Sequence, residues 1–168
     1  METVEIKGLR ELRIALTRTI PFEMQGKVLQ KALSPAARLT VLQARANTSS
    51  FKAPTGRLRR AIYAARDRDG SKPTFESRVI TVRRGRKRDD PRGAFYWKFV
   101  EFGHRVGTAA TGYLQKRGRG AGHSGETKFV PAQPFLRPAF QATKLQAAQT
   151  ITDTLRRLLE DAARKARW

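Results

Sequence analysis

The sequence contains no cysteine and has two histidines among its 168 residues. The absence of cysteine excludes disulfides, thiolate catalysis and zinc–thiolate sites. His104 and His123 have no cluster of carboxylates near them in the sequence, so neither is expected to be a metal ligand or a general base. The sequence also has no phosphate-binding or dinucleotide-binding glycine motif. We therefore expect no catalytic residue, no metal and no cofactor, and predict that the protein is not an enzyme.

Acidic residues are scarce: 14 Asp and Glu stand against 35 Lys and Arg, which gives a net charge of +21. So large an excess creates a positive field over much of the surface, and the expected partners are anionic. Nucleic acid and an acidic protein surface both satisfy this expectation. Long apolar runs are also missing, since no stretch approaches the roughly 20 apolar residues of a membrane span. The first residues, METVEIKGLREL, lack the apolar core of a signal peptide, which predicts a cytoplasmic protein with no membrane partner.

Aromatic residues are few, and half of them lie in two short segments. These segments are AFYWKFVEFG at 94–103 and VPAQPFLRPAF at 130–140. Aromatic side chains bury large areas, so we predict that the two segments pack together as the centre of a single domain spanning 1–168. The expected structural or interface residues are Tyr96, Trp97, Phe99, Glu101, Phe102, Pro134, Phe135, Arg137 and Pro138.

One carboxylate and one guanidinium lie within these aromatic segments, at Glu101 and Arg137. A buried carboxylate is costly unless it is paired or hydrogen-bonded. We therefore predict that Glu101 meets either the Arg137 side chain or a set of backbone N–H groups. The alternative is that Glu101 points into water from an amphipathic turn.

Helical periodicity is clear at both ends of the chain. A short helix from Leu9 is expected to end before Pro21, and a second helical pattern covers 22–47. Within it, Ser34 and Pro35 resemble an N-cap followed by a proline at the first helical position, so we expect a kink or two helices meeting there. The C-terminal helix is expected to start at Pro138 and to reach about residue 165. Its apolar stripe, which packs on the core or on a neighbouring subunit, is Leu145, Ala148, Ile151, Leu155, Leu158 and Ala162.

The middle of the chain carries the residue types that favour strands. Segments 58–66 and 75–83 are rich in β-branched and aromatic residues and are separated by turn formers, which predicts an antiparallel pair. The segment 95–103 has both helical and alternating spacing, and we favour a short helix. The predicted fold class is therefore α+β, with a small antiparallel sheet packed by a long N-terminal and a long C-terminal helix.

Besides a short basic cluster at Arg57, Arg59 and Arg60, basic residues are concentrated in two stretches with little apolar content. The first is RRGRKRDDPR at 83–92, and the second lies in the glycine-rich segment 104–128, which we expect to be a long basic loop. These side chains either contact an anionic partner or provide ordinary solubility charge. The candidate contacts are Arg83, Arg84, Arg86, Lys87, Arg88, Lys116, Arg117 and Arg119.

The order of the motifs resembles a known family. GLRELR near Gly8, the PTGRLR element at 54–59, FYWKFVEFG at 95–103 and PAQPFLRPAF at 131–140 follow one another as in the tailed-phage neck, or tail-completion, family. That family is typified by the tenth gene product of the lambdoid phage Hong Kong ninety-seven. The sequence departs from the family pattern in its long Gly/Arg segment and in having His104 where threonine is usual.

The resemblance implies a small α+β virion protein without catalytic residues. It implies a ring of identical subunits, a hexamer, at the head–tail junction, next to the head–tail connector and the tail terminator or tail tube proteins. Such a protein is found in the neck or tail of the virion, and in the host cytoplasm during assembly. Contact with the backbone of genomic double-stranded DNA would fit the charge. The alternative function is a basic protein that binds nucleic acid without sequence preference.

Overall fold

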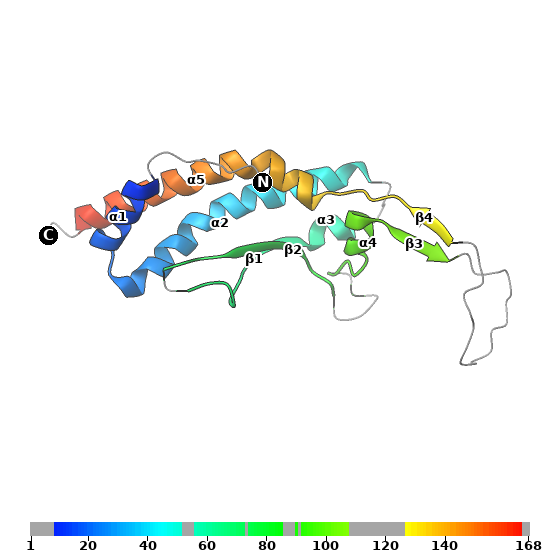
Figure 1. Cartoon of the computed structure of the whole chain (residues 1–168), viewed down its shortest axis with the longest axis horizontal. Helices are drawn as coiled ribbons and strands as arrows, with labels where there is room; N and C mark the ends of the chain where they lie inside the picture. The colour runs from blue at the N-terminus through cyan, green and yellow to red at the C-terminus, as the bar shows by residue number, and fades with distance from the viewer. Residues whose placement is uncertain are drawn as a thin grey trace.

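The computed structural model describes residues 9–51, 56–72, 74–85, 90, 92–107 and 127–165. It is an α+β fold in which two long helices lie along each other and two small antiparallel sheets flank them (Figure 1). The predicted fold class is confirmed, since the sheets are small and antiparallel and the longest helices stand near the two ends of the chain.

The N-terminal part forms helices α1 (Leu9–Thr19) and α2 (Phe22–Asn47), separated at Pro21 as predicted. Of the two alternatives at Pro35, two separate helices are wrong, because α2 continues through this residue as one helix. Proline removes one backbone N–H from the helical ladder. The Ser34 hydroxyl, which was expected to cap a new helix, instead donates a hydrogen bond to the Gln30 carbonyl at 2.7 Å. Buried alanines on both sides of Pro35, Ala32 and Ala36, hold the helix in place, so tertiary packing outweighs the local preference.

The C-terminal helix α5 (Leu136–Lys165) runs antiparallel to α2 and forms the main helix pair (Figure 1). Small side chains allow two helices to approach closely, and the buried positions on this pair are mostly alanine and threonine. Midway along it, the hydroxyls of Thr40 and Thr143 are 2.8 Å apart, while Thr143 also donates to the Ala139 carbonyl. At the far end, α1 closes the pair with a second apolar cluster of Leu16, Ile20 and Leu159.

The predicted apolar stripe of α5 is partly wrong. Leu155 is buried, but Leu145 is 59% exposed. The buried positions of the helix start earlier and lie beside the predicted stripe for part of its length; they are Ala139, Thr143, Thr152, Leu155 and Leu159. Two of these positions are threonines, which an apolar count does not find.

Strands β1 (Ile62–Arg66) and β2 (Arg78–Val82) pair antiparallel, as predicted, with Ile62 opposite Val82. The first predicted strand begins too early, because its start belongs to the short helix α3 (Arg57–Ala61). Beyond the strands, the side chain of Glu76 has no exposed surface and accepts hydrogen bonds from Arg66 Nε at 2.9 and 3.0 Å. This ion pair fixes the loop that joins the strands.

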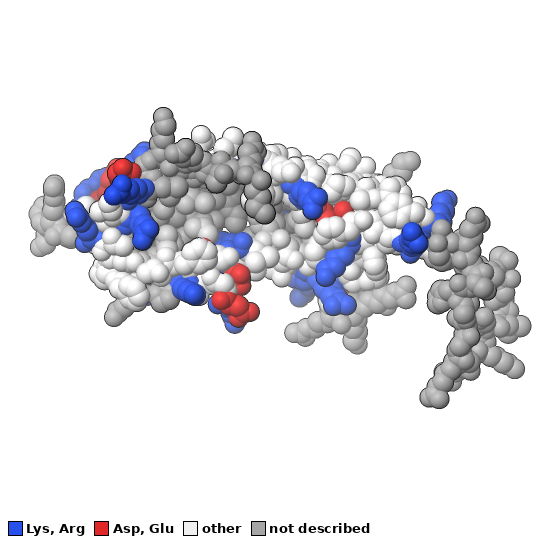
Figure 2. All heavy atoms as spheres, in the orientation of Figure 1, with Lys and Arg blue, Asp and Glu red and all other residues white. Residues whose placement is uncertain are grey.

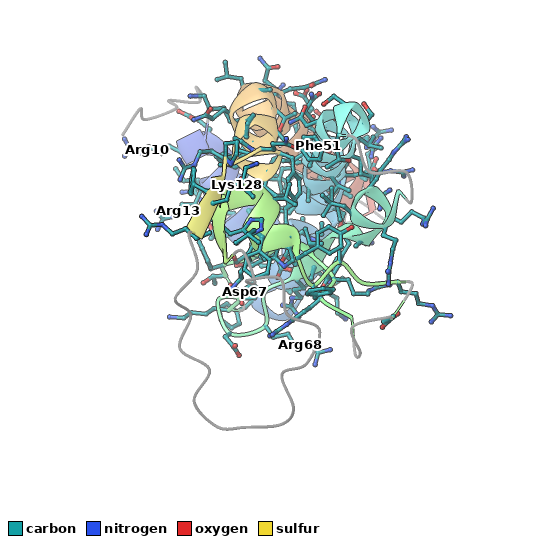
Figure 3. All side chains as sticks on the ribbon, turned by 90° about the vertical axis from the view of Figure 1, so that its right-hand side faces the viewer. Arg10, Arg13, Phe51, Asp67, Arg68 and Lys128 are labelled. Atoms are coloured by element: carbon teal, nitrogen blue, oxygen red, sulfur yellow. The ribbon has the colours of Figure 1, made fainter. Side chains whose placement is uncertain are left out.

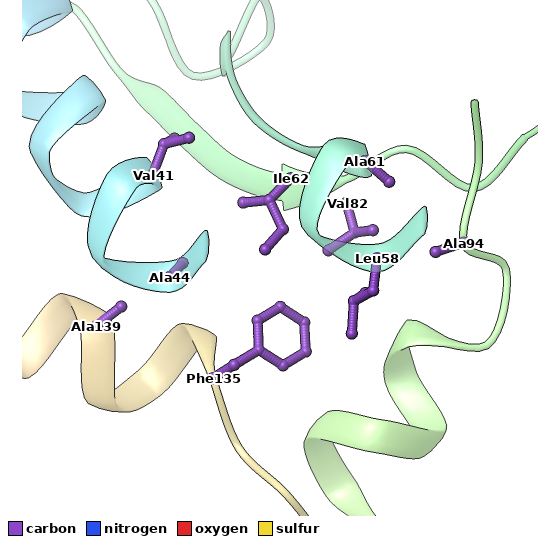
Figure 4. Close-up of a cluster of buried hydrophobic side chains, with 9 residues drawn as sticks. All are labelled: Val41, Ala44, Leu58, Ala61, Ile62, Val82, Ala94, Phe135 and Ala139. Carbon is purple, nitrogen blue, oxygen red and sulfur yellow. The ribbon is translucent and has the colours of Figure 1, made fainter. Parts of the chain in front are cut away.

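The larger core lies where α2, α3, the first sheet and the start of α5 meet (Figure 4). Phe135 is at its centre with no exposed surface, and Ile62 is equally buried. The ring of Phe51 packs edge-on against Phe135 with ring centroids 6.2 Å apart. The full cluster consists of Val41, Ala44, Leu58, Ala61, Ile62, Val82, Ala94, Phe135 and Ala139.

Between Ala94 and Phe135 of this core, the chain forms helix α4 (Trp97–Phe102) and the strands β3 (His104–Gly107) and β4 (Thr127–Val130). The short helix is confirmed. The prediction of an irregular loop over 104–128 is wrong at both ends, because β3 and β4 pair antiparallel with His104 opposite Val130. Glycine content lowered the expectation of order there, whereas the strand residues themselves are mostly compatible with a sheet. Residues 108–126 of the predicted loop lie outside the described residues.

Candidate interaction surface at the aromatic end

The feature that organises this end of the molecule is the carboxylate of Glu101. One oxygen, Oε2, accepts hydrogen bonds from the backbone N–H groups of Phe135 and Leu136 at 2.8 and 3.0 Å. The other, Oε1, accepts from the N–H of Arg137 at 3.1 Å. Glu101 is 7% exposed. The first N–H groups of a helix have no partner within the helix and carry partial positive charge, so a buried carboxylate satisfies them and favours the start of α5.

The alternatives left open for Glu101 are thereby decided. The carboxylate is buried, so it does not point into water, and it meets backbone N–H groups rather than the Arg137 guanidinium. Arg137 contributes its backbone N–H, and its residue surface is exposed. We call this arrangement of Glu101 with residues 135–137 the Glu101 clasp.

The backbone around Gly103 brings the clasp together. Gly103 follows α4 with φ of 73°, a left-handed conformation that glycine adopts without strain. A Cβ atom here would lie 2.9 Å from both the Ala132 nitrogen and the Val130 oxygen. The chain after β4 therefore passes directly over Gly103, and the Gln133 N–H donates to the Val100 carbonyl at 2.8 Å. In the predicted motif EFG, the glycine is thus the residue that permits the close approach.

Arg137→Ala tests which part of Arg137 matters. The free energy of unfolding should change by less than about 0.5 kcal/mol, because alanine keeps the backbone N–H that bonds Glu101 and the guanidinium is exposed. Urea unfolding measures this change. A loss of more than about 1 kcal/mol would show that the guanidinium itself supports the clasp.

The aromatic residues divide between core and surface. Phe135 is fully buried, and Tyr96 and Trp97 pack partly buried against the same core. The prediction that the aromatic motifs are core is wrong for four phenylalanines, which are 41% to 64% exposed: Phe95, Phe99, Phe102 and Phe140. The helical period of α4 explains the exposure of Phe99 and Phe102, since a helix of six residues beside one core can bury a single face. Pro134 is exposed and Pro138 is partly buried in the first turn of α5.

Besides Phe95, which is 41% exposed, four phenylalanines at this end of the molecule are more exposed. We call them the aromatic end surface: Phe99, Phe102, Phe129 and Phe140. They come from α4, from β4 and from the first turns of α5 (Figure 1). The ring of Phe99 is 5.0 Å from that of His104, and Phe129 lies close to Gly103. Phe129 was not predicted from the sequence, although its position just before the PAQPF motif indicated that it lies near the other aromatic residues.

On the face of the molecule shown in Figure 2, the basic side chains do not form one continuous patch. On the visible face they form several groups along the length of the molecule, and acidic side chains are few. Of the predicted anionic contacts, Arg83 and Arg84 are exposed, with the Arg83 guanidinium 5.5 Å from the centre of the Tyr63 ring. The other candidates, Arg86, Lys87, Arg88, Lys116, Arg117 and Arg119, lie outside the described residues.

Among the described residues, no group of three or more His, Cys, Asp or Glu side chains could hold a metal ion. None of the described helices is apolar over a sufficient length to cross a membrane. The chain matches no protein-family model, and neither the curated proteins nor the solved structures include a significant match. A function can therefore be inferred only from the residues of the aromatic end and from the sequence.

Proposed function

We propose that this protein is a structural virion protein of a tailed phage, forming a ring at the head–tail junction that joins the capsid connector to the tail. The observation that carries the proposal is the aromatic end surface. Its four phenylalanines are between 49% and 64% exposed, and the backbone of the α4 and α5 segments that carry three of them is joined by the hydrogen bonds of the Glu101 clasp. Exposed apolar groups clustered in this way are typical of surfaces that a protein partner covers.

The energetics favour a covered surface. Burying a phenylalanine side chain stabilises by about 1.5 to 3 kcal/mol, so covering four of them supplies a substantial part of the free energy of association. In the resembling family, subunits contact each other in a ring and contact neighbouring rings. The same motifs that carry the resemblance, FYWKFVEFG and PAQPFLRPAF, contribute three of the four phenylalanines.

The charge is consistent with the same role. A net charge of +21 makes a solitary subunit repel itself, and this repulsion is offset by acidic neighbouring proteins or by DNA passing through a ring. Charge alone equally supports the second candidate, a basic protein that coats nucleic acid without sequence preference. That candidate leaves the aromatic end surface without a purpose, because a duplex backbone offers no apolar surface to cover it.

Size-exclusion chromatography with light scattering separates the two functions. The purified protein is run at low and high salt, alone and with duplex DNA. If the protein forms a ring, we expect an oligomer that persists at high salt and binds DNA weakly, because salt screens interactions between charges and not apolar contacts. A monomer that binds DNA with an affinity falling steeply with salt concentration would support the second candidate instead.

Two variants test whether the aromatic end surface makes the ring contacts. Phe102→Asp and Phe129→Asp place a charge in the proposed interface, so the oligomer should dissociate at a concentration at least about tenfold higher than for the unchanged protein. Phe22→Asp is the matched control, because Phe22 is 61% exposed at the start of α2. Equal dissociation of all three variants would contradict the assignment of the interface to this end.

A further inference from the structure

A hollow of about 460 Å³ lies between α2 and α3, away from the Glu101 clasp. Its walls come from the exposed side of the last turns of α2 and from the start of α3, where Gly56 has a left-handed φ of 58°. The lining residues are Leu42, Arg45, Ala46, Gly56, Arg59 and Arg60. We call this hollow the arginine pocket. Among the residues that the structure describes, its lining includes three arginines and no carboxylate.

The polar wall of the arginine pocket is partly pre-positioned. Arg45 Nη2 donates to the Ile62 carbonyl at 2.8 Å, which holds its guanidinium in place. The Nε of the same side chain is buried and has no hydrogen-bond acceptor in the part of the chain that the structure describes. Arg59 is exposed at the opposite wall. Arg60 already interacts with another group of the protein, so the contacts proposed below are those of Arg45 and Arg59. Guanidinium groups bind carboxylates and phosphates with short, charge-assisted hydrogen bonds.

The second wall of the arginine pocket is apolar. Leu42 is 52% exposed, and Ala46, one turn further along α2, is exposed beside it. The pocket therefore presents a leucine and an alanine next to two arginines. A nucleic-acid backbone satisfies the arginines but has no large apolar group to cover the leucine. A peptide that carries acidic and apolar side chains next to each other satisfies both walls.

We propose that the arginine pocket binds an acidic, apolar peptide segment of a partner protein. Glutamate or aspartate side chains of the segment contact Arg45 and Arg59, and a neighbouring aliphatic side chain packs on Leu42 and Ala46. The charge is complementary, since the pocket lining is cationic and belongs to a chain of net charge +21. The volume matches the insertion of side chains rather than a whole fold. This site is separate from the aromatic end surface and does not depend on the ring assignment.

Fluorescence anisotropy with a fluorescein-labelled peptide of alternating Glu and Leu tests the proposal. Arg59→Glu should weaken binding at least about tenfold, because it replaces a charge-assisted contact with a repulsion. Leu42→Ser should weaken binding by roughly threefold or more through lost apolar contact. Arg13→Glu is the matched control, since it makes the same change of charge on α1 at the other end of the molecule (Figure 1). Its side chain points away from the body of the protein (Figure 3), and it should change binding by less than about twofold.

Each remaining outcome bears on the proposal directly. The same peptide with Gln in place of Glu should not bind, which shows that the carboxylates are needed. If the Glu–Leu peptide does not bind, the proposal is overturned. It is also overturned if Arg59→Glu and Arg13→Glu lower the affinity equally, because the peptide would then respond to the overall charge of the protein and not to the arginine pocket. An unchanged affinity in Leu42→Ser, together with displacement of the peptide by duplex DNA, would assign the pocket to nucleic acid. Circular dichroism of the variants checks that all retain the fold, as expected for exposed positions.

Discussion

Phe135→Ala should lower the free energy of unfolding by about 3 to 5 kcal/mol, the largest effect expected for a single substitution in this chain. Phe135 has no exposed surface and lies at the centre of the larger core (Figure 4). Alanine would remove the ring and leave a cavity facing Leu58 and Ile62, and the edge-on contact with Phe51 would be lost. The Asn47 side chain also donates to the Phe135 carbonyl at 3.0 Å, which limits how far the backbone can move to fill the cavity.

Urea unfolding followed by circular dichroism measures this loss, and Phe22→Ala is the control. Phe22 lies at the start of α2, outside the aromatic end surface, and is 61% exposed, so its replacement should change stability by less than about 0.5 kcal/mol. The two variants remove the same atoms in different surroundings. If both lost the same stability, Phe135 would not be the centre of the core.

Glu101→Ala should lower the free energy of unfolding by about 3 kcal/mol. It leaves the N–H groups of residues 135–137 without their acceptor and removes a negative charge from the start of α5. For a chain of this size, the melting temperature should fall by roughly 6 to 12 °C. The contact joins residues 34 to 36 positions apart in the sequence, so its loss also releases α4 from α5.

Two further variants show whether the charge or the hydrogen bonds matter. Glu101→Gln keeps one acceptor oxygen and removes the charge, so it should lose about half as much stability as alanine. Glu160→Ala removes the same charge from an exposed position of α5 and should change stability by less than about 0.5 kcal/mol. A Glu101→Ala protein as stable as the Glu160→Ala protein would show that solvent replaces the clasp without cost.

Much of the fold could be predicted because its signals are local. The end of α1 before Pro21, the span of α2, the β1–β2 pair and the end of α5 follow from proline geometry, helical period and β-branched residues. The burial of Glu101 was predicted against the alternative of an exposed carboxylate, since a carboxylate buried among aromatic residues needs hydrogen-bond donors. The sequence could not decide whether the Glu101 carboxylate binds a side chain or the backbone, because Arg137 offers both a guanidinium and a backbone N–H group.

The sequence by itself determined the fold class and the excess of positive charge, and it indicated that the segments containing Glu101 and Arg137 meet. The tertiary structure decided which aromatic residues are covered, whether α2 continues through Pro35, and where Arg45 and Arg59 form a pocket with Leu42. The reason is physical. Secondary-structure propensity and hydrophobic period depend on residues a few positions apart. Burial and pocket shape depend on which distant segment packs against an element, and the sequence of one helix does not identify that segment.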